Sequence, residues 1–107
     1  MYFNKDTMKQ EVVEGGITRY IYTGEHMQVV EYHFPPGKSF PMHRHEIHEQ
    51  MGLLVSGRLG FMLDGQETVL LPGDYYHAAL NVDHRAWTLD EPAVLVDFFS
   101  PPRDDLR

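Results

Sequence analysis

The sequence contains no cysteine, so neither disulfide bonds nor thiolate metal sites are available to this chain. Any metal ion must therefore be held by histidine nitrogens and by oxygen atoms. The chain also lacks an apolar run of about 18 residues that could cross a bilayer. Its amino terminus, MYFNKDTMKQ, has no hydrophobic segment of the kind found in secretory signals. We therefore expect a cytoplasmic protein.

Positive charge is scarce, with 9 Lys and Arg against 16 Asp and Glu and a formal net charge of −7. An acidic surface repels nucleic acid phosphates and anionic lipid headgroups, so we expect neither nucleic acid nor a membrane as a partner. An anionic small molecule is still an acceptable partner, because one buried arginine can attract it locally.

Helical periodicity is also missing, and short apolar, β-branched and aromatic segments alternate with Gly/Pro turns. With 107 residues, of which 42% are hydrophobic, the chain is long enough for one compact domain, residues 1–107. We predict strands over residues 17–23, 26–34, 50–56, 59–63, 66–71, 75–79, 84–89 and 93–100, and either a strand or a loose turn over 7–13. Such regularly spaced short strands indicate an all-β barrel or sandwich.

The richest stretch for chemistry is residues 37–57, GKSFPMHRHEIHEQMGLLVSG. Within it, His43 and His45 are two positions apart, so their imidazoles share a face if the segment is a β-strand. Two neutral imidazoles side by side are typical of a site for a divalent metal ion. Three further groups that could bind a metal or transfer a proton follow at once, namely His48, Glu49 and Gln50.

The spacing within this stretch resembles the first motif of the cupins. That motif is a glycine, five residues, H-x-H, three or four residues, an acid or glutamine, six residues and a glycine. The matching positions are Gly37, His43, His45, Gln50 and Gly57.

A second cupin-like motif follows, a PGD turn and then a bend that ends in histidine. The turn is Pro72-Gly73-Asp74 and the histidine is His84. The family's proline and glycine in the bend are replaced here by Ala79 and Asn81. Asparagine tolerates the left-handed backbone that glycine would adopt, so the bend is expected to form. The resemblance implies an RmlC-like jelly-roll β-barrel.

The same resemblance implies a metal site made by His43, His45, Gln50 and His84 for one divalent transition metal: Ni, Zn, Fe, Mn or Co. Glu49 is an alternative ligand, but only Gln50 keeps six residues before the closing glycine. A neutral glutamine leaves the full positive charge of the metal on the pocket. That charge suits Lewis-acid chemistry on an anionic substrate better than it suits O2 activation.

The last predicted strand carries a carboxylate among apolar residues, with Leu95, Asp97 and Phe99 on one face. A buried carboxylate is costly unless it is paired or functional. If this face lines the barrel mouth, Asp97 lies opposite the metal and Phe99 forms a wall of the pocket. Arg103 follows a Pro-Pro stop and could fold over the opening, where its planar guanidinium matches a carboxylate.

Simpler interpretations of these residues stay open. Asp97 and Arg103 could form a salt bridge that anchors the tail, and Phe99 could be a core residue. His48 could be exposed or structural, and Tyr76 could shape the pocket or only fill the barrel core.

The ending FSPxRxD, together with the chain length and the three-histidine, one-glutamine set, is similar to the KdgF-like uronate-linearising cupins of pectin and alginate breakdown. This resemblance implies a metal-dependent isomerase or tautomerase that converts cyclic 4,5-unsaturated uronate monosaccharides to linear 5-keto-4-deoxyuronates. It assigns catalysis to Asp97, Phe99 and Arg103. The alternatives are a metal-dependent cupin dioxygenase and a non-catalytic module that binds sugars or small acids. Exposed edge strands lead us to expect a homodimer.

Overall fold

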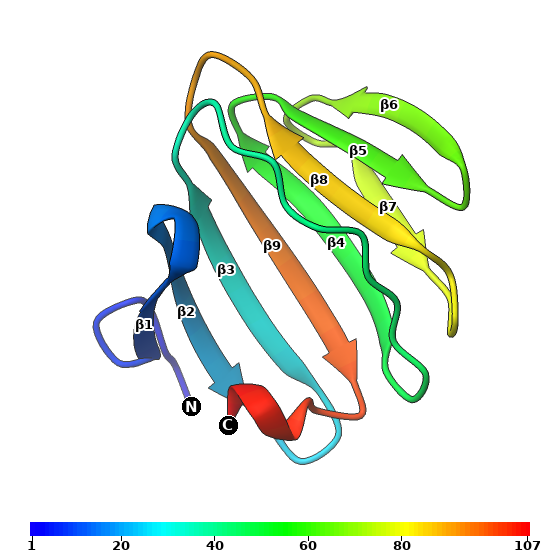
Figure 1. Cartoon of the computed structure of the whole chain (residues 1–107). Helices are drawn as coiled ribbons and strands as arrows, with labels where there is room; N and C mark the ends of the chain where they lie inside the picture. The colour runs from blue at the N-terminus through cyan, green and yellow to red at the C-terminus, as the bar shows by residue number, and fades with distance from the viewer.

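Two antiparallel sheets of unequal size face each other in the computed structural model, which describes all 107 residues (Figure 1). Their strands are β1 (Lys9–Val13), β2 (Ile17–Thr23), β3 (Gln28–Phe34), β4 (Glu49–Ser56), β5 (Leu59–Leu63), β6 (Gln66–Leu70), β7 (Tyr75–Ala78), β8 (His84–Thr88) and β9 (Ala93–Ser100). The predicted strands are all present, with ends that shift by no more than two residues, and residues 9–13 of the uncertain first segment form β1.

Helix is limited to two single 3₁₀ turns, η1 (Glu14–Gly16) and η2 (Asp104–Leu106). Neither helix approaches the length and hydrophobicity that a bilayer crossing requires. The all-β prediction is therefore confirmed.

The larger sheet has the order β1-β2-β3-β9-β4-β7, and the smaller sheet has the order β6-β5-β8. The last strand, β9, therefore lies in the middle of the larger sheet, between β3 and β4 and antiparallel to both (Figure 1). This jelly-roll arrangement brings the carboxy-terminal part of the chain beside the segment that follows β3.

The core fills the space between the sheets with side chains from one face of each strand. On β9 the buried positions alternate, so that Leu95, Asp97 and Phe99 all point inward, as predicted. One apolar cluster contains Phe99 with Ile21, Val30 and Leu106. The other contains Ile17, Phe34, Leu54, Leu59, Phe61, Leu70, Tyr76, Ala78, Ala93 and Leu95. Asp97 thus lies between two apolar residues on the interior face.

Two turns have the left-handed backbone that the sequence predicts. Asp64 (φ 51°) and Gly65 (φ 80°) join β5 to β6 with the positive φ values of a tight hairpin. Asn81 has φ 64°, so it adopts the conformation expected where the cupin bend has glycine. The cupin-like bend is therefore formed in spite of its two substitutions.

Candidate metal centre and adjoining cavity

The segment that carries His43 and His45 lies outside the named strands. It pairs with β8 through isolated bridges, one of which joins His43 to His84. The backbone N–H of each of these residues donates to the carbonyl of the other at 2.9 Å. The Asn81 N–H also donates to the carbonyl of His45 at 2.8 Å. These bonds join the two cupin-like motifs and bring the third histidine beside the first two.

The three imidazoles form a cluster in which one nitrogen from each ring lies within 4.8 Å of the others. The ring centres of His43 and His84 are 4.1 Å apart, and those of His45 and His84 are 5.5 Å apart. The Nδ1 atom of His84 is 3.0 Å from the Val82 carbonyl, which favours a proton on Nδ1 and a free lone pair on Nε2. Burial, followed by the positive charge of Arg103, lowers the pKa of His45 to about 4, so this ring is neutral at neutral pH.

Gln50 lines the same cavity as His43 and His84, whereas Glu49 does not. Gln50 is buried, and Glu49 lies on the outer face of β4, where His77 is 2.7 Å away. Strand alternation thus leaves Gln50 as the oxygen group on the side of the histidines.

Three buried side-chain atoms have no hydrogen-bond partner in this structure, namely His45 Nε2, Gln50 Oε1 and His84 Nε2. Buried polar atoms are almost always paired. All three atoms belong to the predicted ligand set, and all three can donate a lone pair. The residues present therefore fit a divalent transition metal.

Asp97 lies beside the cluster and is held by two neighbours. It accepts hydrogen bonds from the Tyr76 hydroxyl at 2.5 Å and from Gln50 Nε2 at 3.1 Å. Burial raises the pKa of Asp97 to about 7, although both hydrogen bonds and the charge of Arg103 oppose this rise. A carboxyl group with such a pKa can accept and release a proton near neutral pH.

Arg103 does not pair with Asp97, so the proposed tail-anchoring salt bridge between them is not formed. Its guanidinium donates to Asp105 instead, with a 2.7 Å bond from Nη2 to Oδ2, and its Cζ lies 5.0 Å from the centre of the Phe99 ring. Phe99 in turn packs edge-on against the ring of His45, with ring centres 5.7 Å apart. Phe99 is therefore both a core residue and a wall of the site.

The carboxy-terminal segment folds back against the barrel and does not fray. The Gln28 side chain accepts a hydrogen bond from the Arg103 N–H at 3.0 Å and donates to the Arg103 carbonyl at 3.2 Å. Leu106 is only 1% exposed and packs beside Phe99. His48 supports the preceding turn, with its Nδ1 atom 2.8 Å from the Pro101 carbonyl. These contacts fix the position of the Arg103 backbone, from which its side chain extends.

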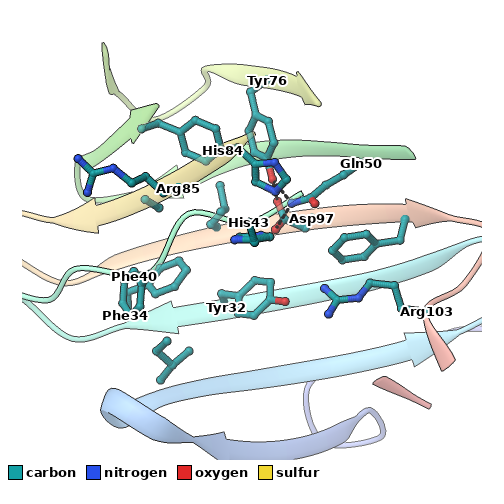
Figure 2. Close-up of a pocket in the computed structure, with 15 residues that line it drawn as sticks. Tyr32, Phe34, Phe40, His43, Gln50, Tyr76, His84, Arg85, Asp97 and Arg103 are labelled. Atoms are coloured by element: carbon teal, nitrogen blue, oxygen red, sulfur yellow. Dashed lines mark hydrogen bonds between the residues drawn. The ribbon is translucent and has the colours of Figure 1, made fainter. Parts of the chain in front are cut away.

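A cavity of about 150 Å³ connects these groups (Figure 2). Its polar lining includes His43, Gln50, His84, Arg85, Asp97 and Arg103, and its aromatic walls include Tyr32, Phe34, Phe40, Phe61 and Phe99. In Figure 2, Arg85 and Arg103 lie at opposite ends of the view, with His43, His84 and Asp97 between them.

Only one of these arginines is available to a ligand in the cavity. The guanidinium of Arg85 lies 4.8 Å from the centre of the Trp87 ring and 3.8 Å from Glu67. Arg85 and Trp87 alternate with the inward-facing His84 and therefore lie on the outer face of β8. Arg103 is thus the cation that the cavity presents.

The structure adds residues that the sequence interpretation did not identify. Tyr76 was considered only as a possible pocket or core residue, yet it bonds to both Gln50 and Asp97. A Cβ atom at Gly52 would clash with the Tyr76 ring and come within 2.5 Å of Asp97 Oδ1. A lone glycine inside an apolar strand is the one signal that could have indicated this close approach. Gln28 carries no such signal.

Comparisons with known proteins extend over nearly the whole chain. The model of a family described as "Cupin domain" matches residues 30–99. The pectin degradation protein KdgF of Dickeya dadantii (strain 3937) is 35% identical over 105 residues, which cover 97% of this chain and 96% of that protein.

Two solved structures are similar over the same extent. The structure of KdgF from Halomonas sp. matches with a TM-score of 0.92 and 32% identity, covering 100% of this chain and 98% of that one. An RmlC-like cupin from Shewanella frigidimarina NCIMB 400 matches with a TM-score of 0.90 and 28% identity, covering 99% and 95% respectively. The likeness therefore includes the carboxy-terminal segment that carries Arg103.

Proposed function

This chain belongs to the cupin domain family, and from that premise we propose that it is a metal-dependent enzyme that converts cyclic 4,5-unsaturated uronate monosaccharides to linear 5-keto-4-deoxyuronates. The observation that carries the proposal is the buried carboxylate of Asp97, one hydrogen bond from the Gln50 amide, in a cavity that also contains the Arg103 guanidinium. The 35% identity to a pectin degradation protein supports a uronate as the substrate.

His43, His45, Gln50 and His84 are the residues that would hold the metal. When bound, a divalent metal supplies a Lewis acid that stabilises negative charge on substrate oxygens. None of these four ligands is an anion, so they would not offset the positive charge of the metal. That charge would favour binding of an anionic sugar.

Asp97 is proposed to move the protons. Ring opening removes the proton of the anomeric hydroxyl and breaks the bond between the anomeric carbon and the ring oxygen. Ketonisation then adds a proton to the alkene carbon, so the overall change is an isomerisation that needs no other reactant. The pKa of Asp97, raised to about 7, lets one carboxyl group act first as base and then as acid.

Arg103 and Phe99 are proposed to position the substrate. The guanidinium of Arg103 would bind the uronate carboxylate, since it is the cation that faces the cavity. Asp105 holds the Nε and Nη2 side of this guanidinium and thereby orients it. Phe99 supplies an apolar wall that keeps water from the reacting carbons.

The test is to incubate the metal-loaded protein with the 4,5-unsaturated galacturonate monomer and follow the absorbance of the conjugated alkene. We expect the absorbance to fall, and we expect a chelator and the Asp97→Asn variant each to prevent the fall. The matched control is Asp90→Asn, because Asp90 pairs with Arg58 at the surface, away from the cavity. No loss of absorbance with any unsaturated uronate would refute the enzyme and favour a binding module.

A dioxygenase has less support from the site. Glu49, the alternative carboxylate ligand, pairs with His77 on the outer face, so the oxygen ligand available is the amide of Gln50. Oxygen uptake by the Fe(II)-loaded protein, measured with an oxygen electrode, would separate the two activities.

A further inference from the structure

The amide of Gln50 can adopt only one of its two orientations. Its Nε2 donates to the Tyr76 hydroxyl oxygen at 2.6 Å and to Asp97 Oδ2 at 3.1 Å (Figure 2). Tyr76 uses its single hydrogen on Asp97 Oδ1. When Asp97 is ionised, a flipped amide would place its carbonyl oxygen against two acceptors, with no proton between them. The three side chains therefore form a closed set in which every donor is used.

This set determines where the remaining atom of the amide points. Gln50 Oε1 is one of the three buried atoms without a partner, together with the Nε2 atoms of His45 and His84. Gln50 and Asp97 are each 4% exposed and Tyr76 is 7% exposed, so water does not compete for their bonds. The oxygen thus keeps a lone pair that no group of the protein uses, as do the two imidazole nitrogens.

We propose that Tyr76 is a positioning residue which, together with Asp97, fixes the Gln50 amide with its oxygen toward the histidine cluster and so selects an amide over a carboxylate at position 50. This inference rests on the metal site of the proposed function, but not on the uronate reaction.

A glutamate at position 50 would fail for a simple reason. Both of its oxygens would be acceptors, and the one directed at Asp97 Oδ2 would meet another acceptor. The group is buried, so the repulsion is not relieved by solvent. An asparagine at position 97 removes the repulsion between positions 50 and 97, because its Nδ2 can donate to the introduced carboxylate. The single proton of the Tyr76 hydroxyl then serves one of its two neighbours, position 50 or position 97. Only one of positions 50 and 97 can therefore carry a carboxylate, and it can be either of the two.

The sheet register shows how the chain makes room for this set. Gly52 on β4 is the direct neighbour of both Tyr76 on β7 and Asp97 on β9. Because Gly52 has no side chain, the Tyr76 ring can cross above the strand and reach Asp97. The contact between Tyr76 and Asp97 is thus specified by three adjacent strands.

The experiment measures binding of Co²⁺ in competition with a chelator, with the cobalt absorption spectrum as a second readout of the ligands. We expect Tyr76→Phe to weaken Co²⁺ binding roughly ten- to a hundred-fold, as loss of a group that orients a ligand usually does. The matched control is Tyr75→Phe, since Tyr75 is the next residue, is 74% exposed and should leave the affinity unchanged. Circular dichroism and thermal unfolding in chelator establish that each variant is folded.

A second pair of variants tests whether an amide is selected over a carboxylate at position 50, and this test does not depend on Tyr76→Phe. Gln50→Glu alone should lose at least tenfold in Co²⁺ affinity, and adding Asp97→Asn should restore most of it with a changed cobalt spectrum. Wild-type affinity in Tyr76→Phe, or a double variant no better than Gln50→Glu, would overturn the inference. Absence of Co²⁺ binding by the wild type would overturn it as well. Co²⁺ binding as expected without uronate turnover would refute only the proposed reaction.

Discussion

At the scale of the residue, the site depends on ionisable groups that are buried beside one another. Asp97 is the clearest case, because an apolar strand carries it into the interior between Leu95 and Phe99. Burial favours its neutral form, whereas the Tyr76 hydroxyl and the Gln50 amide favour its carboxylate. The balance gives Asp97 a proton affinity suited to proton transfer, and it also makes stability depend on pH.

We predict that the contribution of Asp97 to the stability of the metal-free protein falls as pH rises from 3.8 to about 7. Its pKa is 3.8 without the fold and about 7 in the folded protein, so between these values the folded state binds more protons. The stabilisation is therefore complete below pH 3.8 and is lost as pH rises to about 7. The stability of Asp97→Asn relative to wild type should accordingly increase by up to ~4 kcal/mol from about pH 4 to about pH 8.

The measurement is urea unfolding of both proteins in chelator across this pH range. The two proteins differ only at position 97, so the contribution of the other groups cancels in the difference. A constant offset between the two proteins would mean only a lost hydrogen bond. Such a flat difference would contradict a raised pKa for Asp97.

At the scale of the element, β9 and the segment after it act as one unit. Strand β9 supplies Asp97 and Phe99, and the segment supplies Arg103. Two anchors hold the segment in place, the bonds of the Gln28 side chain to the Arg103 backbone and the burial of Leu106 in η2. Arg103 can therefore keep its position although it lies beyond the last strand.

We predict that Leu106→Ala weakens both the fold and the binding of the uronate carboxylate. Loss of a fully buried leucine side chain should cost about 2–5 kcal/mol of unfolding free energy. Because the anchor of the segment is lost, KM for the unsaturated uronate should rise more than kcat falls. Chemical denaturation and initial-rate kinetics check the two parts.

Leu80→Ala is the matched control for this change, because Leu80 is 49% exposed and its truncation should alter stability by less than about 0.5 kcal/mol. An unchanged KM in a clearly destabilised Leu106→Ala protein would show that the tail stabilises the barrel without positioning Arg103.

At the scale of the whole molecule, the outer face of the larger sheet is covered only in part by the chain itself, where Phe3 stacks on Tyr22 of β2. Phe98 and Met51 are cross-strand neighbours on this face and are 40% and 50% exposed. Val96 and Leu53 are the next pair along the same two strands. Adjacent exposed apolar side chains of this kind are typical of surfaces that bind another protein.

We predict a homodimer that covers this face, with a sedimentation mass about twice the 12.4 kDa of the chain. Phe98→Glu should shift the protein toward monomer, since it would bury a charge between the subunits. Val69→Glu is the control, because Val69 lies on β6 of the smaller sheet and is 44% exposed. A wild type that sediments as a monomer at high concentration would contradict this prediction.

The sequence by itself determined the features that depend on neighbouring residues. Strand alternation predicts that Asp97 faces inward with Phe99, and the turn residues predict the positive φ of Gly65 and Asn81. These features are local, because side-chain direction and backbone conformation follow from a few adjacent positions. The spacing of His43 and His45, with the resemblance to the cupin motifs that added His84, identified three groups that the structure does bring together.

Only the tertiary structure decided which distant groups meet. Tyr76 reaches Gln50 across 26 positions, and Gln28 reaches Arg103 across 75. Both contacts depend on the order of the strands, since β9 lies between β3 and β4. A residue pattern along one strand carries no information about which strand becomes its neighbour. The sequence therefore could not predict which residues contact Asp97 and Arg103, and only the assembled sheets decide this.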